Sequence, residues 1–190
     1  MMERRQQLMN SIMAAIFAAL MGILSQFSVP IGAVPVTLQT LIASLAGIVL
    51  GRKWGTVSVA VWILVGVFGV PVFANARSGP AVLFSPTGGY IIGFLLISWI
   101  SGTWIRRNRP FWMNYLISVL SVALCYAFGL AVFVLYFRYG LHKDMTLVQA
   151  LVLTVLPFFP FDLIKMVISV TLGLKVRQAL IMAGFVREER

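Results

Sequence analysis

The segment PFFPFDLIK, residues 157–165, places two prolines, an acid and a base within an otherwise apolar stretch of the chain. Proline lacks a backbone N–H and interrupts a helix, and a charged side chain at the centre of a bilayer costs about 2.5–3.5 kcal/mol on insertion scales. Irregular backbone is tolerated at membrane depth where it is buried in protein or lines a wet cavity. The segment therefore predicts a broken transmembrane helix whose polar residues face the protein interior.

The whole chain has the composition of a polytopic membrane protein. Hydrophobic residues make up 61% of its 190 residues and charged residues 11%, whereas soluble domains average about 45–50% and about 25%. At about 20 residues per crossing, this length accommodates about six helices, so we expect an all-α fold with a single membrane domain, residues 1–190. The apolar segments that predict the six transmembrane helices are 8–27, 37–50, 55–73, 87–105, 111–137 and 147–174.

The first of these segments also has the basic start of a cleaved signal peptide, at Arg4 and Arg5. Its apolar run exceeds the usual length of about 7–15 residues for such peptides. The charge alternation of the later loops also requires this helix, so we expect it to be retained.

The 15 Lys and Arg residues are distributed unequally between the two sides of this topology. One side carries Arg4, Arg5, Arg52, Lys53, Arg106, Arg107, Arg109, Lys175, Arg177, Arg187 and Arg190. The other side carries Arg77, Arg138 and Lys143. The positive-inside rule therefore predicts that both termini are cytoplasmic. The net charge of +10 fits membrane lipid with anionic headgroups and not nucleic acid, which requires a basic face with aromatic or polar readers.

Polar and turn residues gather in the loops predicted to face outward and in the broken last span. The candidate ligand-binding residues are Thr37, Gln39, Asn75, Arg77, Tyr90, Asp162 and Lys165. Because these residues gather toward the outer half, we expect a site that opens outward and is built by three separate chain segments. Arg77 suits either a solvated surface charge or a contact to a carboxylate. Thr87 is expected to cap the helix that follows it.

Asp162 and Lys165 are three residues apart, so they share one helix face and can pair. A helix starting near Asp162 is also expected to direct N–H groups into the cavity, where they would attract anions. Two interpretations of the pair remain open. It forms either a polar floor for a ligand or an internal ion pair that only joins two helices, with Lys165 extending toward the interface.

Small residues recur at helical spacing in the first apolar segment. Ala14 and Ala18 lie four residues apart, as do Ala15 and Ala19, and such spacing lets helices approach closely in lipid. The face they form suits internal packing or a partner protein. The similar spacing of Gly47, Gly51 and Gly55 is interpreted as internal packing.

Motifs for enzymatic chemistry are missing from the sequence. It contains neither the P-loop pattern of ATPases nor the H-E-x-x-H and G-x-S-x-G patterns of hydrolases. Cys125 and His142 are its only cysteine and histidine, so we expect no metal site, no cofactor and no enzymatic activity.

Four segments resemble the signature motifs of the BioY family, the biotin-binding S-components of energy-coupling-factor (ECF) transporters. They are PVTLQT at 35–40, GVPVFA at 69–74, SPTGGYIIGF at 85–94 and PFDLIK at 160–165. The resemblance implies a multi-pass subunit of a bacterial or archaeal cell membrane that captures biotin from outside. It also implies partners, namely an ECF transmembrane coupling protein and two ABC-type ATPases.

The resemblance assigns roles to individual residues. Asp162, Lys165, Thr37, Gln39 and Tyr90 match family ligand positions, and the ureido ring of biotin offers the N–H and carbonyl groups that such side chains bind. The residues matching the face that docks on the coupling protein are Ala14, Ala15, Ala18 and Ala19.

One segment departs from the family pattern. NARSG at 75–79 stands where the family is richer in glycine, so the resemblance gives less support to Asn75 and Arg77. Two alternatives of other classes remain: a stand-alone secondary transporter or facilitator for biotin or another small carboxylate, and a helical scaffold without transport activity.

Overall fold

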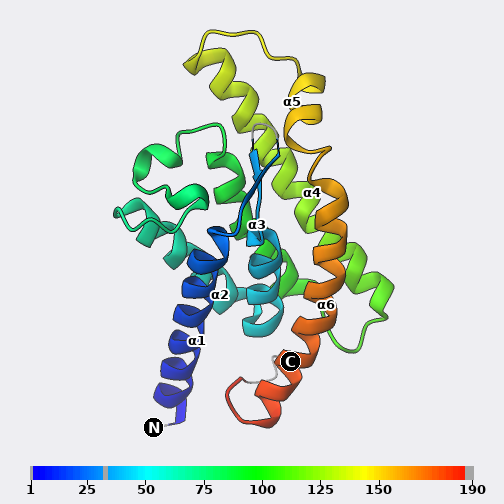
Figure 1. The fold of residues 1–190 in the computed structure, drawn as a ribbon. Helices are drawn as coiled ribbons and strands as arrows, with labels where there is room; N and C mark the ends of the chain where they lie inside the picture. Colours follow the sequence, from blue (N-terminus) through cyan, green and yellow to red (C-terminus); the bar gives the residue numbers. More distant parts are fainter. Residues whose placement is uncertain (1, 32–33, 187–190) are drawn as a thin grey trace.

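The structure, a computed structural model, describes residues 2–31 and 34–186, and it confirms the all-α fold (Figure 1). The helices are α1 (Met2–Ser25), α2 (Gln39–Val67), α3 (Gly88–Trp104), α4 (Phe111–Leu135), α5 (Leu147–Thr154) and α6 (Phe159–Met182). Short helical turns at Ala74–Ala76, Pro80–Val82 and Tyr136–Gly140 lie in the connections. The helices pack side by side in a bundle, with the second and third the most extensively packed pair.

The chain reverses direction inside α2. Gly51 has φ 79° and ψ 176°, a backbone conformation that glycine adopts at little cost. A Cβ added to Gly55 would lie 2.6 Å from the carbonyl oxygen of Ala46, so the two arms of α2 run back along each other. These arms, 39–50 and 52–67, correspond to the second and third predicted spans.

The other predicted spans correspond to α1, α3, α4 and the α5–α6 pair. By length and composition, the helices Arg4–Ser25 and Phe111–Gly140 can cross a membrane. The segment Gln39–Val67 meets the same criteria but is folded back at Gly51 into two arms. The α5–α6 pair passes the same criteria as one span, bent by 54°, and α3 is a shorter apolar helix. The protein is therefore a multi-pass membrane protein.

The first outer loop contains structure that the sequence analysis did not predict. Strands β1 (Val29–Ile31) and β2 (Val34–Val36) pair in antiparallel register, with Pro30 opposite Pro35. Proline is tolerated in edge strands because its missing N–H need not bond a neighbour, and both strands of a two-stranded ribbon are edges. The ribbon is a local addition to an all-α fold.

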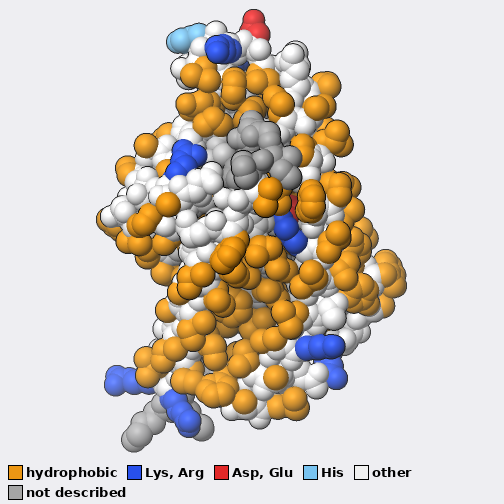
Figure 2. Space-filling view, in the orientation of Figure 1, with side chains coloured by type: hydrophobic (Ala, Val, Ile, Leu, Met, Phe, Trp, Pro, Cys, Tyr) orange, Lys and Arg blue, Asp and Glu red, His pale blue; other side chains and the backbone are white. Residues whose placement is uncertain are grey.

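The predicted sidedness agrees with the arrangement of the chain. α1 begins and α6 ends toward the same end of the molecule, where the α2 reversal and the connection between α3 and α4 also lie (Figure 1). Lys and Arg side chains gather near this end, and apolar side chains cover much of the helical surface between the two ends (Figure 2). We call the half of the molecule toward this end the inner half, and the half that contains the loops 28–36, 71–86 and 138–146 the outer half. Arg187 and Arg190 lie outside the described residues.

Close packing in the inner half depends on small residues. A Cβ on Gly47 would overlap the carbonyl oxygen of Ser98, and one on Gly102 would lie 2.6 Å from the backbone nitrogen of Arg52. The predicted internal packing of Gly47 and Gly55 is confirmed, because substituting either would push neighbouring backbone aside.

A cluster of serine hydroxyls joins four helical segments in the middle of the bundle. The hydroxyl of Ser44 lies 3.0–3.3 Å from those of Ser101, Ser118 and Ser169, and all four residues are fully buried. A hydroxyl has one donor and two acceptor positions, so three neighbours use the capacity of Ser44 completely. The cluster is a satisfied polar joint between α2, α3, α4 and α6.

Candidate ligand-binding site

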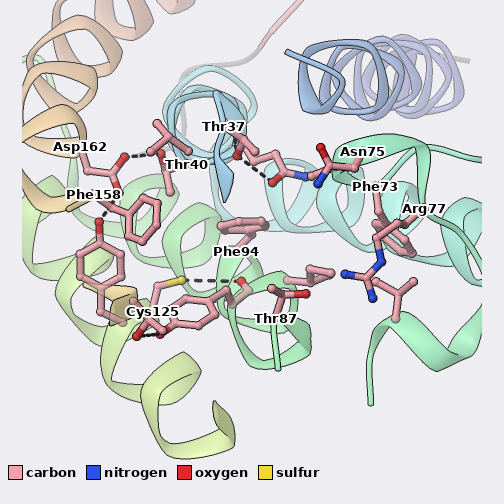
Figure 3. Close-up of a pocket in the computed structure, with 18 of the residues that line it drawn as sticks. Thr37, Thr40, Phe73, Asn75, Arg77, Thr87, Phe94, Cys125, Phe158 and Asp162 are labelled. Carbon is pink, nitrogen blue, oxygen red and sulfur yellow. Dashed lines mark hydrogen bonds between the residues drawn. The ribbon is translucent and has the colours of Figure 1, made fainter. Parts of the chain in front are cut away.

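A cavity lies in the outer half, above the serine cluster. Its empty space amounts to about 750 Å³, including the part open to solvent. Its side chains come from α2, α3, α4, α5, α6 and the loops on the outer side (Figure 3). Every candidate ligand-binding residue predicted from the sequence lines it, namely Thr37, Gln39, Asn75, Arg77, Tyr90, Asp162 and Lys165.

The floor of the cavity is a buried ion pair with neutral partners. Lys165 Nζ lies 2.7 Å from Asp162 Oδ1, and the two residues are 8% and 4% exposed. Thr40 donates to the same carboxylate oxygen at 2.9 Å, and Tyr126 donates to Oδ2. Lys165 also donates to the backbone carbonyl of Thr37 at 2.6 Å. The predicted pairing is confirmed, and both residues line the cavity.

This network leaves hydrogen-bonding capacity for a ligand. A carboxylate offers about four acceptor positions and an ammonium three donor positions. Three of the Asp162 positions and two of the Lys165 positions are used by the described residues. The floor can therefore accept one hydrogen bond and donate another.

The break between α5 and α6 shapes the floor and uses part of the N–H capacity at the start of α6. The carbonyl of Val155 accepts from the N–H of Phe159, and the carbonyl of Phe158 accepts from the N–H of Asp162, while Pro160 has no N–H to offer. The N–H groups of Phe159 and Asp162 are therefore already bonded by the turn at 155–158, which leaves fewer free helix N–H groups for an anion than the sequence predicted.

Aromatic side chains form the cavity walls. Phe73, Phe94 and Phe158 are almost fully buried, and Phe73 packs edge-on against Trp62 with ring centroids 5.2 Å apart. The Tyr90 hydroxyl does not point freely into the cavity, because it donates to Thr154 of α5 at 2.7 Å. Tyr90 therefore contributes mainly its ring face.

The rest of the cavity lining contains two groups of polar residues, Thr37 with Gln39 and Asn75 with Arg77. Thr37 donates to the side-chain carbonyl of Gln39 at 2.8 Å, so these two residues form a joined pair. Asn75 accepts from Ser28 at 2.8 Å. Arg77 is exposed, and its guanidinium makes no hydrogen bond or ion pair with residues 2–31 or 34–186. An unpaired guanidinium at a cavity mouth is suited to a carboxylate.

Several lining residues were not predicted from the sequence. Thr40, Tyr126, Cys125, Thr154, Phe94 and Phe158 also line the cavity. The only available signal for the polar ones was their position inside apolar spans, as for Tyr126 in α4.

Thr87 stands at the N-cap position of α3. The prediction that its side chain caps the helix was wrong, because that side chain makes no capping bond and instead pairs with Ser85 at 3.0 Å.

The alanines of α1 do not share one environment. Ala14 and Ala18 are 2% and 8% exposed and pack against the rest of the chain, so their assignment to a docking face was wrong. Residues at i and i+1 point in different directions on a helix, and Ala15 and Ala19 are exposed. Only these two remain available to a partner.

A sequence model of the BioY family matches residues 2–182. The chain belongs to the BioY family. Among BioY proteins, the biotin transporter BioY of Thermotoga maritima is 38% identical over 168 residues, which cover 88% of this chain and 95% of that protein. The biotin transporter BioY2 of Lactococcus lactis is 34% identical, with coverage of 92% and 93%.

A solved structure shares the fold. It is the crystal structure of the S-component for biotin from an ECF-type ABC transporter, and it superposes with a TM-score of 0.80 at 26% identity. The match covers 92% of this chain and 93% of that one. The expected membership of the BioY family and the expected fold are both confirmed.

Proposed function

We propose that this chain is the S-component of an ECF transporter and that it captures biotin from the outer side of a bacterial or archaeal cell membrane. The single observation that carries the proposal is the buried Asp162–Lys165 pair at the floor of an outward-opening cavity. The relatives named as biotin transporters and the biotin S-component of the same fold support the choice of ligand.

The floor suits the ureido ring of biotin. Asp162 retains one acceptor position for a ureido N–H, and Lys165 retains one donor for the ureido carbonyl. The cavity offers Thr37 and Gln39 as acceptors for the second N–H. The aromatic walls formed by Phe73, Phe94 and Phe158 suit the sulfur-containing ring and the alkyl tail, since apolar walls with few polar groups are usual in ligand pockets.

The acid tail of biotin is then directed to the mouth of the cavity. Lys165 is engaged by Asp162 and the Thr37 carbonyl, whereas Arg77 is exposed and lines the same cavity. A carboxylate–guanidinium contact forms charge-assisted hydrogen bonds. We therefore assign the tail to Arg77 and the ring to the floor.

Delivery of biotin to the cytoplasm requires partners in this proposal. The chain has no P-loop, so ATP hydrolysis is assigned to two ABC-type ATPases that act through a transmembrane coupling protein. The exposed Ala15 and Ala19 on α1 form the proposed docking face, because small side chains permit close helix contact.

Calorimetry on the purified full-length chain tests the ligand assignment. Biotin and desthiobiotin, which both contain the ureido group, are expected to bind, and lipoate, which lacks it, is expected not to. Leaving the buried polar groups of the floor unpaired is costly, which explains the expected difference. Binding of lipoate as tight as that of biotin would contradict the ureido assignment.

Copurification with the coupling protein tests the docking face. The double variant Ala15→Leu and Ala19→Leu is expected to bind biotin normally but to lose the partner. The matched control is Ala123→Leu with Ala127→Leu, an exposed pair at the same spacing on α4, which should keep the partner.

Uptake assays test the ATP-driven assignment. Biotin uptake by vesicles that contain the chain alone, without ATPases, would contradict this assignment and indicate a secondary transporter.

A further inference from the structure

The end of α1 holds the segment 72–77, which we call the rim because it carries Phe73, Asn75 and Arg77 into the cavity wall. The Ser25 hydroxyl lies 2.5 Å from the carbonyl oxygen of Val72. The Gln26 amide nitrogen lies 3.2 Å from the carbonyl oxygens of both Pro71 and Phe73. These contacts attach one helix end to a loop that is more than 40 residues away in the sequence.

Gln26 also binds the part of the rim whose backbone is strained. Its side-chain oxygen accepts from the N–H of Ala76 at 3.0 Å. Asn75 has φ 59° and Ala76 has φ 55°, in the left-handed region where asparagine is tolerated and alanine is disfavoured. Two consecutive residues in this region require support from outside the segment, and the Gln26 amide supplies it from α1.

We infer that Gln26 is a positioning residue for ligand capture, which holds the rim so that Arg77 stays at the cavity mouth. The inference rests on the proposed function, because Arg77 is the proposed contact for the acid tail. Gln26 itself does not line the cavity. Since Gln26 directly follows α1, the helix that carries Ala15 and Ala19, a partner that displaces α1 would alter the rim without touching the floor.

The test compares two ligands in the full-length chain reconstituted in lipid nanodiscs. In the Gln26→Ala variant, the Kd for biotin is expected to rise about tenfold, the loss of about one charge-assisted contact. The Kd for biotin methyl ester, which has no tail charge for Arg77, is expected to change less than about twofold. A residue with only a general structural role would weaken both ligands equally.

The control is Gln6→Ala, at the opposite end of the same helix. Gln6 also bonds a distant backbone carbonyl, that of Phe185 at 3.0 Å, but it lies far from the cavity. This variant should leave both Kd values unchanged. Gln26 is exposed, so its substitution is expected to leave the chain folded, which thermal unfolding can verify.

A rescue variant tests whether the loss of affinity in Gln26→Ala comes from the strained rim backbone and not from general destabilisation of the chain. Because glycine adopts positive φ freely, adding Ala76→Gly to Gln26→Ala should recover most of the affinity for biotin. An unchanged biotin Kd in Gln26→Ala, an equal loss for both ligands, or no rescue would each overturn the inference. A wild-type chain that does not bind biotin would instead refute the proposed function, and the role of Gln26 with it.

Discussion

The outer and inner halves of this molecule use polar residues in different ways. In the outer half, the Asp162–Lys165 pair retains unused hydrogen-bonding positions beside a cavity, and Arg77 has no described partner. Below the cavity, from the middle of the bundle toward the inner end, Ser44 is saturated by three hydroxyls, and glycines bring backbones into contact. Polar groups that satisfy one another hold helices together, whereas those with spare capacity beside a cavity indicate a ligand.

The comparison predicts that substitutions in the two halves separate affinity from stability. Outer-half changes that leave the floor intact should affect binding alone, and inner-half changes should affect stability alone. The floor itself is the exception, because its ion pair both lines the cavity and joins helices, so it contributes to affinity and to stability.

Asp162→Asn is expected to have the largest effect. It leaves the Lys165 ammonium buried without its counter-charge, which costs about 3–5 kcal/mol in buried pairs and should raise the biotin Kd at least about 100-fold. Calorimetry and thermal unfolding measure the two effects. The control is Asp144→Asn, because Asp144 is exposed in the outer loop and should be silent. A wild-type Kd in Asp162→Asn would show that the floor is only a helix joint.

Gly47→Ala should destabilise the chain by about 1–3 kcal/mol, the usual cost of overpacking. Its Cβ would overlap the backbone of Ser98, which cannot move without separating α2 from α3. The fraction of the Gly47→Ala protein that remains folded should bind biotin with the affinity of the wild type. Gly140→Ala is the control, because a Cβ there would meet its nearest neighbour at 3.6 Å. Equal unfolding temperatures for the two variants would contradict the packing argument.

Arg77→Gln is expected to raise the Kd for biotin about tenfold, since a charge-assisted hydrogen bond is worth about 1.5–3 kcal/mol, and exposure places the effect at the lower end. Stability should not change, because the guanidinium has no described partner. Titrations with biotin and with its methyl ester provide the measurement, and only biotin should be affected. Arg138→Gln, on the same predicted side of the membrane, serves as the control. A similar rise in the biotin Kd in this variant would show that the overall positive charge of that side, and not a contact with Arg77, attracts biotin.

Ser44→Ala should have the smallest effect, about 1 kcal/mol of stability for the lost hydroxyl contacts, with no change in the Kd for biotin. Ser11→Ala, which removes an exposed hydroxyl near the start of α1, is a suitable control. If Ser44→Ala weakened binding as strongly as Arg77→Gln, the two halves would not be independent.

Much of the fold and the site could be predicted because each depends on a strong local signal. Apolar segment lengths located the helices, and the basic residues indicated which loops lie together. The Asp162–Lys165 pair stood out because charge is costly within a span. Tyr126 and Thr40 were missed because neutral hydroxyl residues are common in membrane helices and carry no comparable signal.

Other features depend on three-dimensional context that spacing cannot reveal. Ala14 and Ala15 are both alanines with a second alanine four residues later, yet Ala14 is buried and Ala15 is exposed. Only the direction from which α2 approaches α1 decides between them. The role of Gln26 was equally hidden, because its partners lie in a loop some 45–50 residues further along the chain.

The neutrality of the floor has an electrical consequence. Asp162 and Lys165 cancel within the cavity, so a guest whose carboxylate pairs with Arg77 adds no uncompensated charge to the protein. Moving one elementary charge through a transmembrane voltage of 100 mV requires about 2.3 kcal/mol. The filled cavity carries balanced charges, so its own charges would add no voltage-dependent work to a reorientation of the loaded chain.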